Sequence, residues 1–157
     1  MFDGGYFRQN PAPFYGLVRE IFPENICPTT THKFFSLLHA KGRLRRIYTQ
    51  NIDALELLAG VPEDKIVEAH GSFKSGYCTR CKAVYNLRWL KEQIFQGAEE
   101  VPKCPACGGV VRPDVVLFGE ALPARFWANI GADFQGRKYI ELCHGQELCQ
   151  QAIGAQE

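Results

Sequence analysis

Cys78-Thr-Arg-Cys81 and Cys104-Pro-Ala-Cys107 are the two short cysteine pairs that decide how this chain folds. Two residues between paired cysteines let both sulfurs of a tight turn point at one ion, and two such pairs complete a closed tetrahedral shell. A closed shell holds structure and does no hydrolysis. The spacing therefore predicts one structural zinc ion, bound by Cys78, Cys81, Cys104 and Cys107. A disulfide pair and unrelated reduced thiols are the alternatives.

Length and composition are those of a globular chain of about one domain. It has 157 residues, 46% of them hydrophobic and 22% charged, although a larger module cut short would give the same figures. Eighteen Lys and Arg against seventeen Asp and Glu give a formal net charge of +1. The chain therefore has no electrostatic footprint for nucleic acid or an anionic membrane.

The amino terminus shows no targeting signal. It lacks the basic and apolar regions of a secretory signal peptide, and no run of about eighteen or more apolar residues occurs in the chain. Seven cysteines without an export signal favour a reducing intracellular compartment, where Cys27, Cys143 and Cys149 are free thiols. Cytoplasm, nucleus and mitochondrion are equally compatible with this pattern.

Apolar periodicity predicts two helices ahead of the cysteine pairs. Apolar residues recur at helical spacing over residues 14–22, and Pro23 ends the pattern. A second helix is expected over residues 32–41, after the capping hydroxyls of residues 29–31 and before Gly42.

Strand patterns come next. Residues 46–49 predict a short strand that breaks into the polar run 50–53, and residues 54–58 restart a helix. In open α/β sheets the ligand crevice lies at the carboxyl ends of the strands, which is where these polar residues gather. Beyond the cysteine pairs, residues 114–118 predict a buried strand and residues 122–130 a helix.

Residues 135–157 differ from the rest of the chain, because they are rich in Gln and have little apolar weight. Cys143, His144 and Cys149 have metal-binding side chains. Their five-residue gap and the lack of a fourth ligand favour a frayed amphipathic tail instead. No structure is assigned to this segment.

Four motifs in a fixed order resemble those of sirtuins, which are NAD-dependent protein-lysine deacylases. They are Tyr48-Thr-Gln-Asn-Ile-Asp53, Val67-Glu-Ala-His-Gly71, the two cysteine pairs, and Arg112-Pro-Asp-Val-Val-Leu-Phe-Gly-Glu120. Each short motif is weak alone, but all four in sequence are specific, and the resemblance covers roughly residues 7–134.

The resemblance implies an α/β fold. Part of a Rossmann-like parallel sheet is expected in residues 1–77 and 108–134, with an inserted zinc-ribbon small domain, held by the four cysteines, in residues 78–107. Residues 135–157 are expected to be a tail unrelated to sirtuins.

The resemblance also implies an activity, the transfer of an acetyl group from lysine to the ribose of NAD. His70 matches the general base that deprotonates a ribose hydroxyl, a role that suits an imidazole at cellular pH. Residues lining the nicotinamide and ribose pocket are matched by Gln50, Asn51, Ile52 and Asp53. Without the family context, His70 would be a loop or core histidine, and Asn51 and Asp53 turn and helix-capping residues.

A second implied site binds the substrate peptide. Val116, Phe118, Gly119 and Glu120 match the segment where sirtuins clamp an acetyl-lysine peptide as an added strand. Taken alone, this segment would be a buried strand. The expected partners are therefore acetylated-lysine proteins or peptides, with no nucleic acid and no membrane, and the oligomeric state is not predicted.

Several departures from the family pattern affect the expected activity. The glycine-rich NAD cradle, the mobile cofactor loop and the later strands that bind adenosine have no counterpart in residues 1–157. We therefore expect this truncated chain to bind NAD poorly and to have little or no turnover alone. Ala54 replaces a glycine found in many sirtuins, which we expect to be tolerated if its φ is negative.

Two other function classes remain open. One is a non-enzymatic zinc-containing module that binds protein partners or competes with a full-length enzyme. It would bind acetyl-peptide regardless of NAD. The other is a redox protein, which needs an exposed thiol of low pKa at a helix N-terminus.

Overall fold

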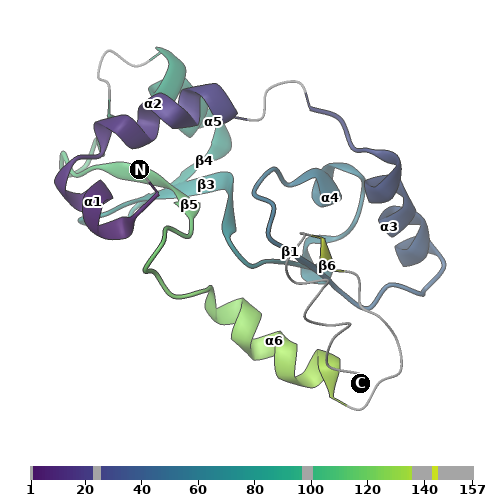
Figure 1. Cartoon of the computed structure of the whole chain (residues 1–157). Helices are drawn as coiled ribbons and strands as arrows, with labels where there is room; N and C mark the ends of the chain where they lie inside the picture. Colours follow the sequence, from purple (N-terminus) through teal and green to yellow (C-terminus); the bar gives the residue numbers. More distant parts are fainter. Residues whose placement is uncertain (1, 23–25, 97–100, 136–142, 145–157) are drawn as a thin grey trace. The chain divides into compact units, whose positions relative to one another are not determined.

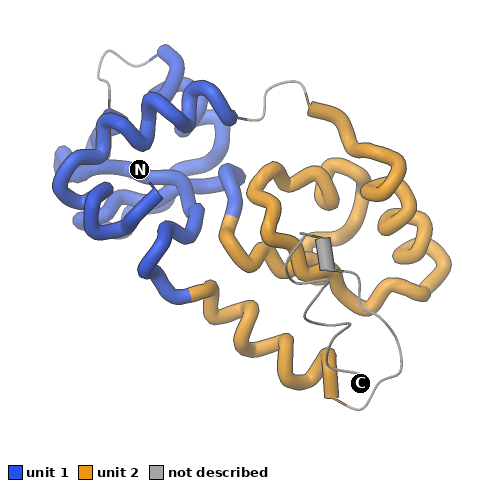
Figure 2. Tube along the Cα trace, in the orientation of Figure 1, with its two compact units in different colours: residues 1–24, 72–121 blue, residues 25–71, 122–157 orange. Residues whose placement is uncertain are grey.

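The computed structural model describes residues 2–22, 26–96 and 101–135, together with the backbone of residues 143–144. The chain divides into two compact units, coloured separately in Figure 2. Unit 1 consists of residues 1–24 and 72–121, and unit 2 of residues 25–71 and 122–157. Each unit is therefore assembled from two separate segments of the chain.

Helices and strands are mixed along the chain (Figure 1). In chain order they are α1 (Gly4–Gln9), α2 (Ala12–Ile21), α3 (Thr30–Ala40), β1 (Ile47–Thr49), α4 (Leu55–Leu58), the 3₁₀ helix η1 (Glu63–Lys65), β2 (Ile66–Glu68), β3 (Gly71–Cys78), β4 (Val84–Asn86), α5 (Leu87–Lys91), the π-helical turn η2 (Glu92–Gln96), β5 (Val111–Val115), α6 (Ala124–Phe134) and β6 (Cys143–His144). Within the described stretches, no helix has the length and apolar character needed to cross a membrane.

Unit 2 is built on a parallel sheet in the order β2-β1-β6. β1 is fully buried and sends neighbouring side chains to opposite faces, as the period of two in a strand requires. Tyr48 packs with Val67 and with Phe126 of α6, whereas Ile47 packs with Phe35 of α3. Both faces of β1 are thus covered by helices, as parallel sheets require, and the predicted α/β class is confirmed.

The predicted helix over residues 32–41 is confirmed as α3. The backbone N–H of Thr29 donates to His32 Nδ1 over 3.2 Å, which completes a capping box at its start. Gly42 follows its end with a φ of +64°, the left-handed geometry that favours glycine.

Unit 1 contains a three-stranded sheet in the order β4-β3-β5, in which β3 and β4 pair antiparallel, and the helices α1, α2 and α5 (Figure 1). Phe7, Phe14 and Tyr15 form an aromatic cluster between α1 and α2. Gly76 of β3 is needed for close packing, because a Cβ there would lie 2.5 Å from the carbonyl oxygen of Arg112. α1 and α2 therefore share a unit with the cysteine pairs. The predicted domains group α1 and α2 with residues 1–77 instead, and those predicted bounds stay a prediction.

One strand lies elsewhere than predicted. β5 spans Val111–Val115 rather than residues 114–118, because the chain turns after Val115 and Gly119 adopts a φ of +84°.

The segment 135–157, to which the sequence assigned no structure, contains a strand. Cys143 and His144 pair in parallel with Tyr48 and Thr49, so β6 extends the sheet at an edge of β1 that would otherwise be open. The side chains of residues 143 and 144, and Cys149, lie outside the described residues.

Candidate functional site

The four predicted zinc ligands come together in unit 1. Cys78 ends β3, Cys81 follows in the next turn, and Cys104 and Cys107 lie in the loop before β5. The Sγ atoms of Cys78 and Cys107 are 3.4 Å apart, those of Cys81 and Cys104 are 3.6 Å apart, and all four lie within 4.8 Å of one another. All four are free thiols.

The backbone around these sulfurs fits a metal-binding knuckle. The backbone N–H groups of Arg80 and Cys81 point at Cys78 Sγ, at 3.4 and 3.5 Å. Gly109 closes the other side, where a Cβ would lie 2.8 Å from Cys78 Sγ and 3.3 Å from Cys107 Sγ. Only a residue without a side chain leaves room there for the sulfurs to converge on one ion. The site therefore fits a tetrahedral zinc ion with four thiolate ligands.

The surroundings of the sulfurs favour thiolates at some positions. Tyr85 stacks on Trp89 with ring centroids 4.1 Å apart, and its hydroxyl lies 3.0 Å from Cys104 Sγ. This hydrogen bond lowers the pKa of Cys104 to about 6. At Cys78, burial raises the pKa, but hydrogen bonds from the amides of Cys81 and Arg80 outweigh it, and the pKa is lowered. Thiolates are the form in which cysteine binds a metal.

Gln50 and His70 meet in unit 2, at the carboxyl ends of β1 and β2. Both residues are half-buried, and His70 Nδ1 lies 3.1 Å from the carbonyl oxygen of Gln50. A carbonyl can only accept, so Nδ1 carries the proton of a neutral ring and Nε2 keeps its lone pair. The hydrogen bond thereby fixes the tautomer that a general base acting through Nε2 requires.

The rest of the polar run lies beside them, and all of its side chains are half-buried. The N–H of Asn51 donates to Thr49 Oγ1 over 3.1 Å, and Asp53 Oδ1 accepts from the N–H of Leu55 over 2.9 Å. The Asp53 side chain and the Asn51 backbone thus hold the turn into α4, and Ile52 lies between these two residues. Their predicted contacts with NAD stay predictions.

Ala54 does not meet the condition set for it. Its φ is +59° and its ψ is 26°, in the left-handed region rather than at negative φ. The condition under which the replacement was expected to be tolerated is therefore not met, because Ala54 takes a left-handed backbone as the residue that precedes α4. A left-handed backbone at an L-residue costs roughly 1–2 kcal/mol.

A buried polar cluster that no sequence motif indicates adjoins this turn. One polar atom from each of His32, Asp53 and Glu56 lies within 4.8 Å of the others, and Glu56 is 1% exposed. Because the N–H of Thr29 donates to His32 Nδ1, the proton of a neutral ring lies on Nε2. A metal bound at Nε2 would need the lone pair of that nitrogen, so a neutral His32 ring in this tautomer does not offer Nε2 as a ligand.

The predicted peptide segment lies in unit 1. Phe118 is 76% exposed and pairs through its backbone with the amino-terminal residues: its N–H donates to the carbonyl of Phe2 and its carbonyl accepts from Gly4. Val116 is half-buried, Gly119 is exposed, and Glu120 binds the buried Arg112. This ion pair lowers the pKa of Glu120. The peptide segment belongs to unit 1 and His70 belongs to unit 2, and the structure describes each within its own unit.

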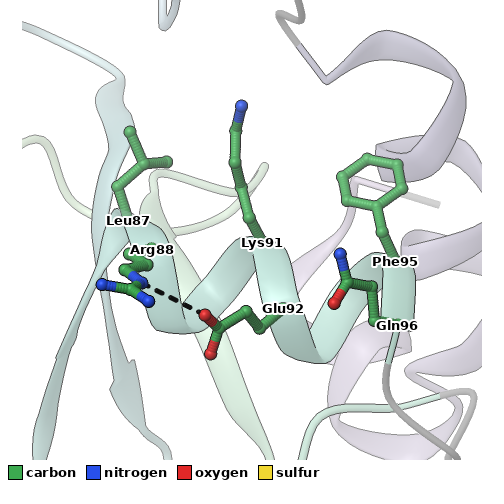
Figure 3. Close-up of a pocket in the computed structure, with 6 residues that line it drawn as sticks. All are labelled: Leu87, Arg88, Lys91, Glu92, Phe95 and Gln96. Atoms are coloured by element: carbon green, nitrogen blue, oxygen red, sulfur yellow. Dashed lines mark hydrogen bonds and ion pairs between the residues drawn. The ribbon is translucent and has the colours of Figure 1, made fainter.

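A shallow hollow of about 360 Å³ lies on α5 and η2 (Figure 3). Leu87, Lys91 and Phe95 stand on one side of it, and Arg88 bonds Glu92 over 3.2 Å. It contains none of the residues with a predicted role and has no functional assignment.

Residues 1–145 match the family model described as Sir2 family. The chain belongs to the Sir2 family. The predicted resemblance to sirtuins is thereby confirmed, and the match includes residues 135–145, which the sequence had placed in the tail.

Individual members of the Sir2 family show the same relationship. The chain is 46% identical over 136 residues to "NAD-dependent protein deacetylase sirtuin-2" of Danio rerio, covering 85% of this chain and 35% of that protein. Identity is 51% over 129 residues to "NAD-dependent deacetylase sir2A" of Dictyostelium discoideum, covering 80% and 25%. It is 47% over 134 residues to "NAD-dependent protein deacetylase sirtuin-3" of Mus musculus, covering 85% and 39%. The chain thus spans about a quarter to two fifths of the length of these relatives.

Proposed function

We propose that this chain takes part in NAD-dependent protein-lysine deacetylation, with acetylated proteins as substrates and His70 as general base. The observation that carries the proposal is the hydrogen bond of His70 Nδ1 to the Gln50 carbonyl, which leaves Nε2 as the basic nitrogen. The names of the Sir2 relatives, which describe NAD-dependent protein deacetylases, support it further.

The residues of unit 2 have distinct parts in this proposal. Bound NAD would supply the ribose that receives the acetyl group and would release nicotinamide. His70 takes a proton at Nε2 from a ribose hydroxyl, and its ring keeps its orientation through Nδ1. Gln50, Asn51 and Asp53 offer amide and carboxylate groups to the hydroxyls and the carboxamide.

The proposal assigns a structural role to one zinc ion. Cys78, Cys81, Cys104 and Cys107 would hold it without an open position, so it takes no part in the chemistry. Four thiolate ligands must stay reduced to bind zinc, which supports a reducing intracellular compartment for this protein. Little or no turnover by residues 1–157 alone stays a prediction.

The test is nicotinamide release from NAD in the presence of an acetyl-lysine peptide. Zinc-loaded chain is compared with His70→Ala and with His39→Ala, a matched histidine in the last turn of α3. We expect a low rate above background that disappears in His70→Ala and persists in His39→Ala. Equal release by wild type and His70→Ala would refute the role of His70. No release from folded, zinc-bearing chain, combined with peptide binding that ignores NAD, would favour the interaction module.

A further inference from the structure

Arg112 is a buried cation in the middle of unit 1. It lies in β5 with only 5% of its surface exposed. Its guanidinium carbon is 5.6 Å from the ring centroid of Phe7 and 5.5 Å from that of Tyr77, so two aromatic faces contact the charge. A cation this deeply buried needs an anionic partner.

Glu120 is that partner, and it binds in two-point geometry. Nη1 and Nη2 of Arg112 each donate to one carboxylate oxygen of Glu120, both over 2.7 Å. Such a paired contact fixes direction as well as distance. Nη2 also donates to the carbonyl of Val115, so one guanidinium joins the end of β5 to a residue eight positions along the chain.

The ion pair shapes the turn between its two ends. Glu120 Oε2 accepts from the N–H of Leu117 over 3.0 Å, and the N–H of Glu120 donates back to the carbonyl of Leu117 over 3.0 Å. Gly119 supplies the positive φ of this turn. Leu117 is 2% exposed while Phe118 is 76% exposed, so the turn anchors one apolar side chain and presents the next.

We propose that Arg112 is a positioning residue that acts through Glu120 to hold the Leu117–Gly119 turn in the form that receives the acetyl-lysine peptide. This rests on the proposed function, which assigns peptide binding to Val116, Phe118, Gly119 and Glu120. Arg112 itself is too deeply buried to touch a peptide. Its effect on the peptide must therefore pass through the carboxylate and the turn.

The decisive variant is Arg112→Lys, which keeps the charge and the aromatic surroundings but cannot form a planar two-point contact. Arg88→Lys is the matched control, because Arg88 also pairs with a glutamate in unit 1 but is 89% exposed and lies on α5. Two quantities are measured on the zinc-loaded full chain. One is the affinity for a fluorescent acetyl-lysine peptide beside its unacetylated form, and the other is amide hydrogen exchange at Leu117.

We expect Arg112→Lys to weaken peptide binding at least tenfold and to speed exchange at Leu117 at least tenfold. Exchange in β3 and zinc content should stay unchanged, and Arg88→Lys should resemble wild type in every measurement. Should Arg112→Lys fail to fold, Glu120→Gln probes the same contact while leaving the buried cation in place.

Two results would overturn the inference. One is unchanged exchange at Leu117 in Arg112→Lys, whatever happens to peptide affinity. The other is faster exchange at Leu117 with peptide affinity intact, because peptide binding would then not depend on the turn that Arg112 holds. Failure of the wild-type chain to bind the acetylated peptide refutes the proposed function instead, and exchange at Leu117 then decides alone whether Arg112 holds the turn.

Discussion

Replacing Ala54 with glycine should stabilise unit 2, although glycine in place of alanine usually destabilises a helical segment. Ala54 immediately precedes α4 and has a φ of +59° and a ψ of 26°. Its side chain is half-buried, and Asp53 Oδ1 holds the next turn by accepting from the N–H of Leu55. The backbone is therefore fixed in a conformation that only glycine adopts without strain.

The expected size follows from two opposing terms. Removing the Cβ relieves roughly 1–2 kcal/mol of left-handed strain. Glycine also gives the unfolded chain more freedom, which costs about 0.5–1 kcal/mol relative to alanine. The difference leaves a gain of up to about 1.5 kcal/mol, equivalent to a rise in melting temperature of up to about 6 °C for a chain of this size.

Urea unfolding followed by far-UV circular dichroism measures this change. Ala59→Gly is the matched control, because Ala59 ends the same helix with a φ of −75° and carries no left-handed strain. It should lose about 0.5–1 kcal/mol, so the two variants should differ by about 1–2 kcal/mol in opposite directions from wild type. A loss of stability in Ala54→Gly equal to that in Ala59→Gly would refute a left-handed backbone at residue 54.

Three further predictions concern the metal knuckle and a buried carboxylate. Native mass spectrometry should find one zinc ion per chain, lost on Cys104→Ser; an intact zinc signal in that variant would exclude the site. Gly109→Ala should weaken zinc binding at least tenfold in a chelator competition, because its Cβ would meet Cys78 Sγ at 2.8 Å, whereas Gly131→Ala, with no atom within 4 Å of its Cβ, should bind as wild type. Asp133 is 3% exposed and accepts three hydrogen bonds, so Asp133→Asn should cost about 2 kcal/mol of stability. Burial raises the pKa of Asp133, but the hydrogen bonds from Tyr48, Arg46 and Arg45 outweigh burial, so the pKa is lowered. The stabilisation that ionised Asp133 gives the fold is therefore present above the ordinary aspartate pKa of about 3.9. It is lost as the pH falls through the lowered pKa. Parallel acid-unfolding curves for wild type and Asp133→Asn would contradict this.

Local patterns predicted the features that depend on neighbouring residues. The capped helix α3, the strand β1 and the gathering of four cysteines each follow from spacing that the chain shows directly. The position of the polar run after β1 was predicted for the same reason, because a strand that ends at Thr49 places the side chains that follow it at one edge of a parallel sheet.

Features that depend on distant contacts gave no such signal. In the sequence, nothing marks Arg112 and Glu120 as partners among the charged residues of their motif. The turn between them brings Nη1 of Arg112 within 2.7 Å of Oε1 of Glu120. The φ of Ala54 is imposed by the entry into α4, against its own preference. β6 follows from an open edge beside β1 rather than from any strand pattern in a Gln-rich segment.

The register of the parallel sheet explains why His70 and Gln50 meet although twenty residues separate them. Thr49 pairs with Glu68 at the carboxyl ends of β1 and β2, and the N–H of Ala69 donates to the carbonyl of Thr49 over 2.8 Å. Gln50 follows Thr49 directly and His70 follows Ala69, so both residues leave the sheet at the same edge, which brings the His70 ring to the Gln50 carbonyl. All of these contacts belong to unit 2, so the tautomer of His70 depends on the strand register and not on the zinc ligands of unit 1. Removing zinc should therefore leave the Nδ1 proton of His70 in place, and a change in its nitrogen chemical shifts on chelation would show that the two units are coupled.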